Sequence, residues 1–363
     1  MGTKIILATG TGGIGGVNFV RALRLAERQT GEDYKIIGTD FNRFRIHFSE
    51  LDKRYRTPRH SDPEFLPTLL NICKNHEVQF LHPHPSVEAK VVAENNHLFE
   101  SIGVKTFLPS PKAIMPDKLY IHHALEKQNV PSPHTFPIKE LDDIDEAFRH
   151  LGKPLWIRVT RGAGGRLSLR VDTPEEAKLW VKLNVIQNRA EISDFILQEY
   201  LPGRDIAFDS LWYRGKLVTS YARERLEYPF KHITLTGLTG TPTLARIIID
   251  EKVNEVGTAA VRAIDPEPHG FYSVDIKENE NGMPVVTEVD GKWHTTAPLW
   301  GYALAKTMGD PLFNLAYIYV RLGYNEDIPD LPEYNLFPEN LYLVRQLDSG
   351  VLLTNTREVW RVV

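Results

Sequence analysis

The sequence has very little cysteine, no long apolar segment and no excess of positive charge. Cys73 is the single cysteine among 363 residues, which excludes an intrachain disulfide and a metal cluster built on cysteine thiolates. No stretch of about 18 apolar residues occurs, so the sequence predicts no membrane-spanning helix. The 43 Lys and Arg residues against 47 Asp and Glu residues leave a net charge of −4. This balance argues against nucleic acid and anionic lipid as partners, because both attract clustered basic residues.

The rest of the composition is that of a folded globular protein of ordinary size. Hydrophobic residues make up 42% and charged residues 25% of the chain, which is average for a globular protein. At about 100–200 residues per domain, the length indicates two or three domains. Glycines from residue 10 onward interrupt the first apolar stretch, so we expect no signal peptide and a cytoplasmic location.

A glycine-rich turn follows the first predicted strand. Residues 4–8 are apolar, a Gly-x-Gly-x-x-Gly motif covers 10–15, and residues 17–28 have helical periodicity. A second strand over 34–39 ends at Asp40. This order is the dinucleotide-binding fingerprint, in which glycine lets the backbone approach a phosphate at a helix N-terminus. The turn either binds a nucleotide or only closes the strand–helix unit.

The fingerprint makes an NAD(P)-dependent oxidoreductase one candidate function. Tyr302 and Lys306 even have the spacing of the acid–base pair of short-chain reductases. However, Tyr302 comes very late in the chain, within an apolar segment over 300–305 that indicates a packing helix. The N-terminal motif therefore leaves two functions open: an NAD(P)-dependent oxidoreductase and a non-catalytic nucleotide-binding protein.

Strands and helices continue to alternate up to about residue 110. Helices are predicted over 66–74 and 87–99, and strands over 78–82 and 104–108, which indicates a parallel, doubly wound unit. His82 and His84 come at the end of one of these strands. Because no third ligand is evident, we interpret them as loop histidines rather than metal ligands.

A second glycine cluster follows a predicted strand over 153–159, which carries Arg158. Another strand, over 167–171, returns from the cluster, so the unit is a strand–loop–strand flap rather than the strand–loop–helix of a Walker A site. Backbone N–H groups of such a flap, with nearby arginines, can close over a polyphosphate. The residues of the flap are Gly162, Ala163, Gly164 and Gly165.

Three carboxylates gather on a predicted hairpin further along the chain. Its strands cover 270–277 and 284–290 and are joined by an Asn-Gly turn. They place Asp275, Glu288 and Asp290 close together, and carboxylates repel one another unless a cation neutralises them. Oxygen ligands of this kind suit Mg²⁺. The alternative is solvated charge on an edge hairpin.

These motifs, in this order, resemble the ATP-grasp superfamily, particularly the branch that is similar to the carbamoyl phosphate synthetase large subunit and to carboxylate–amine ligases. The resemblance covers residues 1 to about 310 and implies an α/β fold with α+β lobes. It implies a Rossmann-like pre-ATP-grasp domain over 1–110, an N-lobe with the flap over 111–192 and a C-lobe with the metal site over 193–325. Residues 326–363 are then a linker and a β-hairpin, which we expect on the outside or against a sister subunit.

The resemblance also implies roles for individual residues. Lys118 and Arg158 are the cationic contacts to ATP, the residues at 198–201 hold the adenine and Asp205 holds the ribose. Two Mg²⁺ ions, which Mn²⁺ can replace, are bound by Asp275, Glu288 and Asp290. Lys292 closes the motif, which here has Asp290 and Lys292 where the family usually has Asn and Arg. The implied ATP-binding residues are Lys118, Arg158, Gly162, Ala163, Gly164, Gly165, Gln198, Glu199, Tyr200, Leu201 and Asp205.

The implied activity is that of a ligase that activates a carboxylate as an acylphosphate for attack by an amine and releases ADP and phosphate. Arg158, Asp290 and Lys292 are its expected catalytic residues. The expected partners are a small-molecule carboxylate and an amine. A homodimer is one expected assembly of the chain. The candidate substrate contacts are Gly12, Gly13, Glu88, Arg223, Arg225, His294 and Thr295. For Arg223 and Arg225, a solvated strand face is the alternative.

Overall fold

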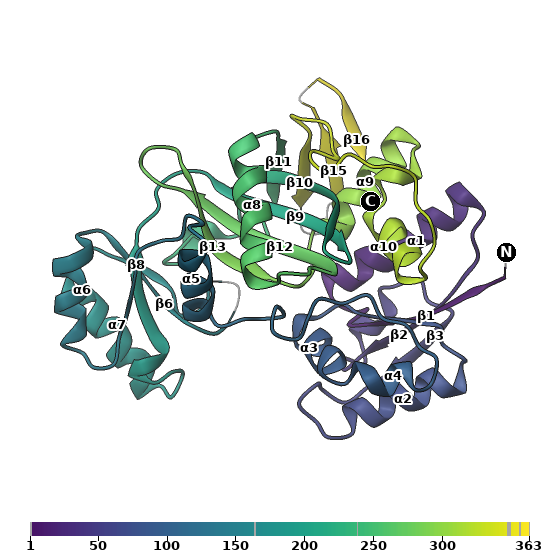
Figure 1. The fold of residues 1–363 in the computed structure, drawn as a ribbon, viewed down its shortest axis with the longest axis horizontal. Helices are drawn as coiled ribbons and strands as arrows, with labels where there is room; N and C mark the ends of the chain where they lie inside the picture. The colour runs from purple at the N-terminus through teal and green to yellow at the C-terminus, as the bar shows by residue number, and fades with distance from the viewer. Residues whose placement is uncertain (1, 163–164, 238, 347–349, 356, 363) are drawn as a thin grey trace.

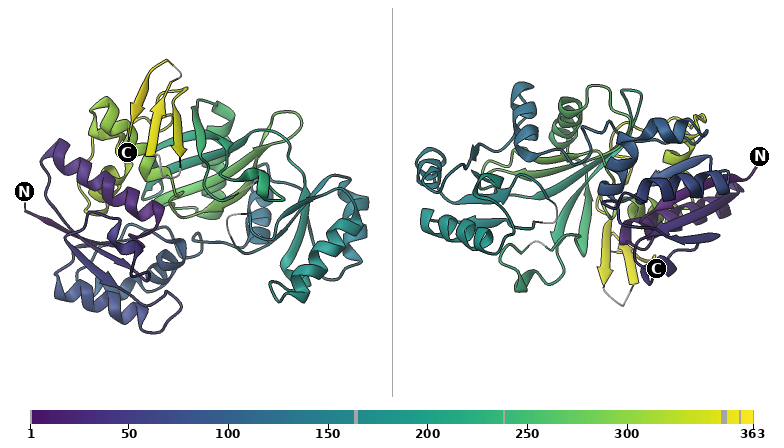
Figure 2. Two further views of the ribbon diagram at one scale, coloured as in Figure 1. Left: turned by 180° about the vertical axis from the view of Figure 1, so that it is seen from behind. Right: turned by 90° about the horizontal axis from the view of Figure 1, so that it is seen from below.

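The computed structural model describes residues 2–162, 165–237, 239–346, 350–355 and 357–362 (Figure 1). Its strands form three sheets, of which the eight-stranded one lies between the two four-stranded ones. Two further views show the N-terminal domain and the first lobe at opposite ends of this large sheet (Figure 2). The fold is therefore a mixed α/β architecture, as expected.

The N-terminal domain is built on a parallel sheet with the order β3-β2-β1-β4. Successive side chains of a strand point to opposite faces. Ile6 and Ile36 accordingly enter one buried cluster, while Leu7 and Ile37 enter another on the other face. Burial on both faces explains why these strands are apolar runs without alternation. The strands are β1 (Lys4–Thr9), β2 (Tyr34–Asp40), β3 (Lys53–Arg56) and β4 (Phe80–Pro83).

Helices cover both faces of this parallel sheet. One face carries α2 (Phe65–Asn75), α3 (Ser86–Glu94) and α4 (Asn96–Glu100), and the other carries α1 (Ile14–Thr30). The predicted strand over 104–108 is reduced to a single bridge between Phe80 and Lys105.

Two helices from late in the chain also belong to this region. They are α9 (Ala297–Met308) and α10 (Leu315–Gly323), and both contact α1. Trp300 of α9 and Tyr319 of α10 are fully buried in a cluster that also contains Phe19 of α1. The segment that the sequence assigns to the end of the C-lobe therefore joins that lobe to the N-terminal domain.

The first lobe has a four-stranded sheet with the order β5-β8-β6-β7. Its helices α6 and α7 pack on this sheet. Helix α5, whose start is capped by the side chain of Asp117, instead packs against α8 (Glu251–Ile264) and β13 (Pro284–Asp290) beside the large sheet, although its residues belong to the predicted N-lobe. Strand β8 completes this sheet, although the predicted lobe boundary at 192 places it in the C-lobe. The elements are α5 (Lys118–Lys127), β5 (Thr135–Pro137), α6 (Asp143–Leu151), β6 (Leu155–Val159), β7 (Leu169–Val171), α7 (Pro174–Ile186) and β8 (Phe195–Glu199).

The large sheet is antiparallel, with the order β13-β12-β9-β10-β11-β14-β15-β16, and α8 packs against it. The C-terminal strands pair with β11 through β14, so they continue the sheet instead of forming a separate outer hairpin. Leu343 and Leu353 are buried in the core as a result. The elements are β9 (Asp205–Tyr213), β10 (Lys216–Glu227), β11 (Leu244–Ile248), α8 (Glu251–Ile264), β12 (Gly270–Glu278), β13 (Pro284–Asp290), β14 (Tyr342–Gln346), β15 (Gly350–Thr354) and β16 (Val359–Arg361).

Candidate active-site cleft

A cleft of about 700 Å³ lies where the N-terminal domain, the first lobe and the large sheet meet. One wall of the cleft is formed by Trp156, residues 198–201 and Asp205, and we call it the hinge side. The N-terminal side is lined by Ile14 and Gly15 at the start of α1 and by His84 to Ser86 after β4. Strands β12 and β13 provide the floor between the two sides, with Asp275 and Glu288 in the lining.

The hinge side is the connection between β8 of the first lobe and β9 of the large sheet. Gln198 is buried and its Nε2 donates to Thr135 Oγ1 at 2.9 Å, which fixes the side chain at the cleft wall. Asp205, at the start of β9, accepts hydrogen bonds from Tyr228 Oη at 2.8 Å and from Arg225 Nη1 at 3.2 Å. The residues implied for adenine and ribose therefore share one wall of the cleft.

Three cations surround Glu288 on β13. Glu288 Oε2 lies 3.3 Å from Arg158 Nη2 and 3.6 Å from Lys118 Nζ. Its Oε1 lies 3.9 Å from Lys292 Nζ. Burial alone would raise the pKa of the Glu288 carboxyl, but the positive charges of Lys118 and Lys292 hold it below its ordinary value.

The cation cluster of Lys118, Arg158 and Lys292 is only partly neutralised. Lys292 also pairs with Asp290 through a 2.7 Å contact, and the negative charge of Asp290 helps to raise the pKa of Lys292 against the effect of burial. Glu288 and Asp290 together carry one charge fewer than the three cations. A cleft floor with excess positive charge attracts anions such as phosphate or carboxylate.

The glycine-rich flap begins beside this cluster. Lys118 Nζ donates to the carbonyl of Gly162 at 2.8 Å, which ties the start of the flap to the cation cluster. Gly165, at the other end, is among the residues that line the cleft. Ala163 and Gly164 lie outside the described residues.

Asp275 connects the cleft lining to a network of charged side chains beneath it. It accepts hydrogen bonds from Arg225 and from His294 Nε2, the latter at 3.0 Å. The other ring nitrogen, Nδ1, lies 2.7 Å from Asp209 Oδ1. Both ring nitrogens face carboxylates, and the negative charges of Asp209 and Asp275 raise the pKa of His294 against the effect of burial. The neighbouring Thr295 lines the cleft.

Arg223 is completely enclosed in the same network. Only 1% of it is exposed, and its guanidinium binds Asp209 and, at 2.9 Å, Tyr221 Oη. Arg223 and Arg225 do share one face of β10, as the two-residue period predicts, but that face meets the carboxylates of β9 and β12. Arg225 lines the cleft, whereas Arg223 lies behind it.

The three predicted metal ligands are neutralised by protein cations in this arrangement. Within the described ranges, the ligand atoms of Asp275, Glu288 and Asp290 do not all come within 4.8 Å of one another. Their oxygen chemistry nevertheless fits Mg²⁺, which is usually held by one or two carboxylates together with substrate phosphates. Asp275 and Glu288 both line the cleft and can provide such a contact. Asp290 instead accepts from the Met115 N–H at 2.9 Å and is buried.

Polar groups of the N-terminal glycine turn form hydrogen bonds with other residues of the same domain. The N–H of Gly12 donates to Asp40 Oδ2 at 2.9 Å, and Asp40 Oδ1 accepts from the N–H of Asn42 at 2.7 Å. Asp40, the acidic residue of the dinucleotide fingerprint, is thus occupied by backbone groups. Gly12 and Gly13 are not among the residues that line the cleft, and the part of the turn that does line it is Ile14 and Gly15.

Glu88 lies inside the N-terminal domain. It is 5% exposed, and its Oε2 has no hydrogen-bond partner among the described residues. Burial raises the pKa of Glu88 to about 7, and the negative charge of Asp40 adds to the effect. It is not part of the cleft lining.

Several cleft residues have no signal in the sequence. Trp293, Lys277 and Tyr228 line the cleft although each occurs in an unremarkable local pattern. Asp209 has a weak signal, since it lies four residues after Asp205 on one strand and therefore on the same face. His84 was visible as one of a histidine pair, but its place in the cleft depends on how the three parts of the molecule meet.

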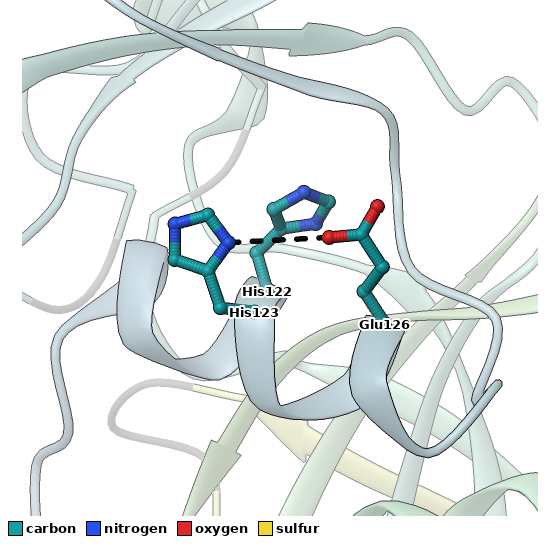
Figure 3. A group of neighbouring side chains, drawn as sticks. All are labelled: His122, His123 and Glu126. Carbon is teal, nitrogen blue, oxygen red and sulfur yellow. Dashed lines mark ion pairs between the residues drawn. The ribbon is translucent and has the colours of Figure 1, made fainter.

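A separate group of possible ligands lies on α5. The side chains of His122, His123 and Glu126 have ligand atoms within 4.8 Å of one another, and His123 pairs with Glu126 at 4.0 Å (Figure 3). The side chains of His123 and Glu126 are largely exposed, and His122 instead has Ser132 Oγ within 3.1 Å. None of the three lines the cleft.

Comparison with known proteins gives a partial match in sequence. Residues 13–107 match the family model described as PylC-like, N-terminal domain. None of the curated proteins compared with the chain matches it. In the described part of the chain, no helix has both the length and the apolar character needed to cross a membrane.

Solved structures are similar over nearly the whole chain. The biotin carboxylase domain of 2-oxoglutarate carboxylase from Hydrogenobacter thermophilus, a dimer in complex with MgADP, ADP and bicarbonate, has a TM-score of 0.66 and 14% identity. The match covers 94% of this chain and 73% of that chain. The L-amino acid ligase from Bacillus licheniformis has a TM-score of 0.65 and 13% identity, covering 94% and 78%. N5-carboxyaminoimidazole synthetase from Staphylococcus aureus, complexed with ADP, has a TM-score of 0.66 and 14% identity, covering 94% and 82%.

Proposed function

We propose that this chain, which has the ATP-grasp fold, is a Mg-ATP-dependent ligase that activates a carboxylate as an acylphosphate and joins it to an amine. The observation that carries the proposal is the cluster of Lys118, Arg158 and Lys292 around Glu288 on the cleft floor. Such a cluster neutralises transferred phosphate, and phosphoryl transfer relies mainly on positioning and charge stabilisation.

ATP is assigned to the hinge side of the cleft. The base lies against residues 198–201, the ribose near Asp205, and the phosphates extend toward Lys118 and Arg158. The contact between Lys118 and the Gly162 carbonyl supports a position of the flap next to the phosphates. Glu288 and Asp275 would hold the Mg²⁺ of Mg-ATP, and the ion would supply further positive charge to the phosphates.

The reaction then runs in two steps. A carboxylate oxygen of the first substrate attacks the γ-phosphorus, a new P–O bond forms, and the bond to the β-phosphate oxygen breaks with its electrons leaving on ADP. Arg158 and Lys292 stabilise the developing charge, and Asp290 holds Lys292 in place through the 2.7 Å ion pair. The amine then attacks the acyl carbon, phosphate leaves with the electrons of the C–O bond, and the nitrogen gives up one proton, which the leaving phosphate can take. Exclusion of water protects the acylphosphate from hydrolysis.

The nucleotide preference tests the proposal directly. We expect Mg-ATP to raise the thermal unfolding midpoint, because a ligand that binds only the folded state stabilises it. NADH and NADPH should leave the midpoint unchanged, since Asp40 is already bound by backbone N–H groups. A screen of ADP release over carboxylates crossed with amines then identifies the substrates. Stabilisation by a nicotinamide cofactor without any response to Mg-ATP would overturn the proposal.

Substitution of Glu288 tests the chemistry at the cleft floor. We expect Glu288→Gln to reduce ADP formation at least about 100-fold, because it removes a magnesium contact and disturbs the cation cluster. The variant should still fold, but with a lower unfolding midpoint, since three cations lose the same carboxylate. Glu280→Gln is the matched control, because Glu280 is exposed at the end of the same hairpin. Turnover near that of the control would exclude Glu288 from the site.

A further inference from the structure

Helix α5 carries two histidines and a glutamate whose side chains gather on one side of the helix, outside the cleft (Figure 3). One ligand atom from each of His122, His123 and Glu126 lies within 4.8 Å of the other two. Across the described ranges of the chain, no other group of three His, Cys, Asp or Glu residues meets this distance. None of the three lines the cleft, so the group lies outside the site proposed for ATP and its substrates.

The helical spacing explains why these side chains meet. Glu126 follows His122 by four residues and His123 by three, and residues three or four apart are neighbours on a helix surface. Glu126 is therefore the common neighbour of two consecutive histidines, and its Oε2 lies 4.0 Å from His123 Nδ1. About one turn of a single helix supplies all three groups, so the fold does not have to rearrange to bring them together.

The three side chains differ in how freely they can adjust. His122 is half-buried, and its Nδ1 lies 3.1 Å from Ser132 Oγ, in the segment between α5 and β5. This contact restrains the ring of His122. The side chains of His123 and Glu126 are 65% and 70% exposed, so they can turn without disturbing the core. The group thus combines one restrained donor with two adjustable donors that an ion can reach from solvent.

The chemistry of the donors selects the kind of ion. Imidazole nitrogens suit Zn²⁺, Cu²⁺ and Ni²⁺, whereas Mg²⁺ prefers oxygen ligands. Tetrahedral Zn²⁺, with bonds of about 2.0–2.1 Å, requires donor atoms about 3.4 Å apart. The donors of the α5 group lie at most 4.8 Å apart, so each separation has to shrink by about 1.4 Å at most. Rotation of the exposed His123 and Glu126 side chains can provide this movement.

We propose that His122, His123 and Glu126 form a binding site for a divalent transition-metal ion on α5, and that Zn²⁺ is the ion that fits it best. The two imidazoles and the carboxylate take three positions of a tetrahedral ion, and water takes the fourth, because the group is open to solvent. The carboxylate also offsets one of the two positive charges of the ion. This site goes beyond the proposed ligase function and does not depend on it.

A second pair of possible ligands shows the importance of the third residue. Glu146 and His150 of α6 are also four residues apart, with 3.4 Å between Glu146 Oε1 and His150 Nε2, and both side chains reach solvent. Among the described residues, no third ligand joins them within the distance that unites the α5 group. The pair on α6 therefore has the same helical spacing but one ligand fewer, which makes it the internal control for the α5 site.

Metal titration of the full chain tests the site directly. The chain is used without an affinity tag and is first freed of metal with a chelator. In calorimetric titration with Zn²⁺ and no nucleotide, we expect one tightly bound ion per chain, which an excess of Mg²⁺ does not displace. Zn²⁺ should also raise the thermal unfolding midpoint, because only the folded helix holds the three ligands together. With Co²⁺ as a probe, the visible spectrum should be that of a tetrahedral ion.

Single substitutions assign the ligands. His122→Ala, His123→Ala and Glu126→Gln should each weaken Zn²⁺ binding at least about tenfold, because each removes one of three direct ligands. His150→Ala on α6 is the matched control and should bind Zn²⁺ as the unsubstituted chain does. His123→Ala and Glu126→Gln change exposed side chains and should keep the unfolding midpoint of the metal-free chain. These two variants decide the question if His122→Ala fails to fold.

Three results would overturn the proposal. The first is the absence of saturable Zn²⁺ binding to the unsubstituted chain. The second is unchanged binding in both His123→Ala and Glu126→Gln, since the ion would then be held elsewhere. The third is a dimer that forms only with Zn²⁺ in size-exclusion chromatography with light scattering, because it would place the ion between two chains. ADP formation in these variants is a separate readout, so a failure of the ligase proposal leaves the zinc result intact.

Discussion

At the scale of single residues, the structure contains a carboxyl group in an unfavourable place. Glu88 is 5% exposed, and burial raises its pKa from an ordinary 4.5 to about 7. The negative charge of Asp40 adds to this rise in the pKa, and the side chain of Thr9 opposes it only in part. The protonation of this one group therefore affects the stability of the whole domain.

We predict that Glu88→Gln removes a pH dependence of stability. Between pH 4.5 and pH 7 the folded chain keeps the proton of Glu88 and the unfolded chain loses it, so raising the pH through this window lowers the free energy of unfolding. The loss amounts to about 3 kcal/mol, since one pKa unit corresponds to about 1.4 kcal/mol. Denaturant unfolding from pH 4 to pH 8 measures it.

The matched control for this prediction is on the same helix. Glu94 of α3 is exposed, so Glu94→Gln should keep the pH dependence of the unsubstituted chain. If Glu88→Gln loses as much stability as the unsubstituted chain between pH 5 and pH 8, Glu88 is ionised in the folded state at both values.

At the scale of elements, the turn before α1 is shaped by its neighbours. Gly12 lies against Arg45 and Asp40, and Gly15 lies against the His84 ring, so side chains at either position would collide. These contacts explain why glycine occupies two positions of the fingerprint without requiring a bound nucleotide.

We predict that Gly15→Ala displaces His84. The added methyl group would lie 2.0 Å from His84 Nε2, and turning the ring away would break the 3.1 Å contact of its Nδ1 with His82 Nε2. Overpacking of this kind costs about 1–3 kcal/mol of stability. Thermal unfolding measures the loss, and the histidine NMR signals report the displaced ring.

Gly13→Ala is the matched control in the same turn. Its added methyl group would approach no atom closer than the Gly10 carbonyl oxygen at 3.4 Å, and its backbone has φ −83°, which any residue can adopt. Equal unfolding midpoints of Gly15→Ala and Gly13→Ala would show that the His84 ring moves aside without a loss of folding stability.

At the scale of the whole molecule, the C-terminal strands hold the large sheet together. Strand β14 covers β11, which would otherwise be an exposed edge, and the side chains of Leu343, Leu353 and Val362 are buried. Lys306 of α9 donates to the Val362 carbonyl at 2.8 Å, so the end of the chain also contacts the helices that join the large sheet to the N-terminal domain.

We predict that deletion of residues 341–363 prevents stable folding. It exposes the edge of β11 and uncovers apolar surface, both of which promote aggregation. Size-exclusion chromatography and circular dichroism melting measure the outcome, with Arg357→Ala at an exposed position as the control. A monodisperse truncated chain with an unchanged unfolding midpoint would contradict the prediction.

The sequence predicted local features well and connections between distant segments poorly. Strand β13 has the bounds expected from its alternation, and the parallel unit was visible in its apolar runs. The placement of β8 in the first lobe, of α9 and α10 against α1, and of the C-terminal strands in the large sheet was not predicted. These placements depend on contacts between segments far apart in the chain, which have no local periodicity.

The candidate site follows the same division. Local patterns place Arg158 on a strand before the flap and Glu288 and Asp290 on one hairpin, because strand period and turn chemistry act over a few residues. Only the tertiary structure brings Lys118, Arg158 and Lys292 around Glu288, encloses Arg223 with Asp209 and makes His84 part of the cleft lining. The sequence by itself therefore determined most of the local secondary structure and which charged side chains are available to form the candidate site. Which charged side chains pair with one another and which face the cleft was decided only where the N-terminal domain, the first lobe and the large sheet come together. Ion pairing depends on distances of a few ångströms, and local sequence patterns do not set distances between separate parts of the chain.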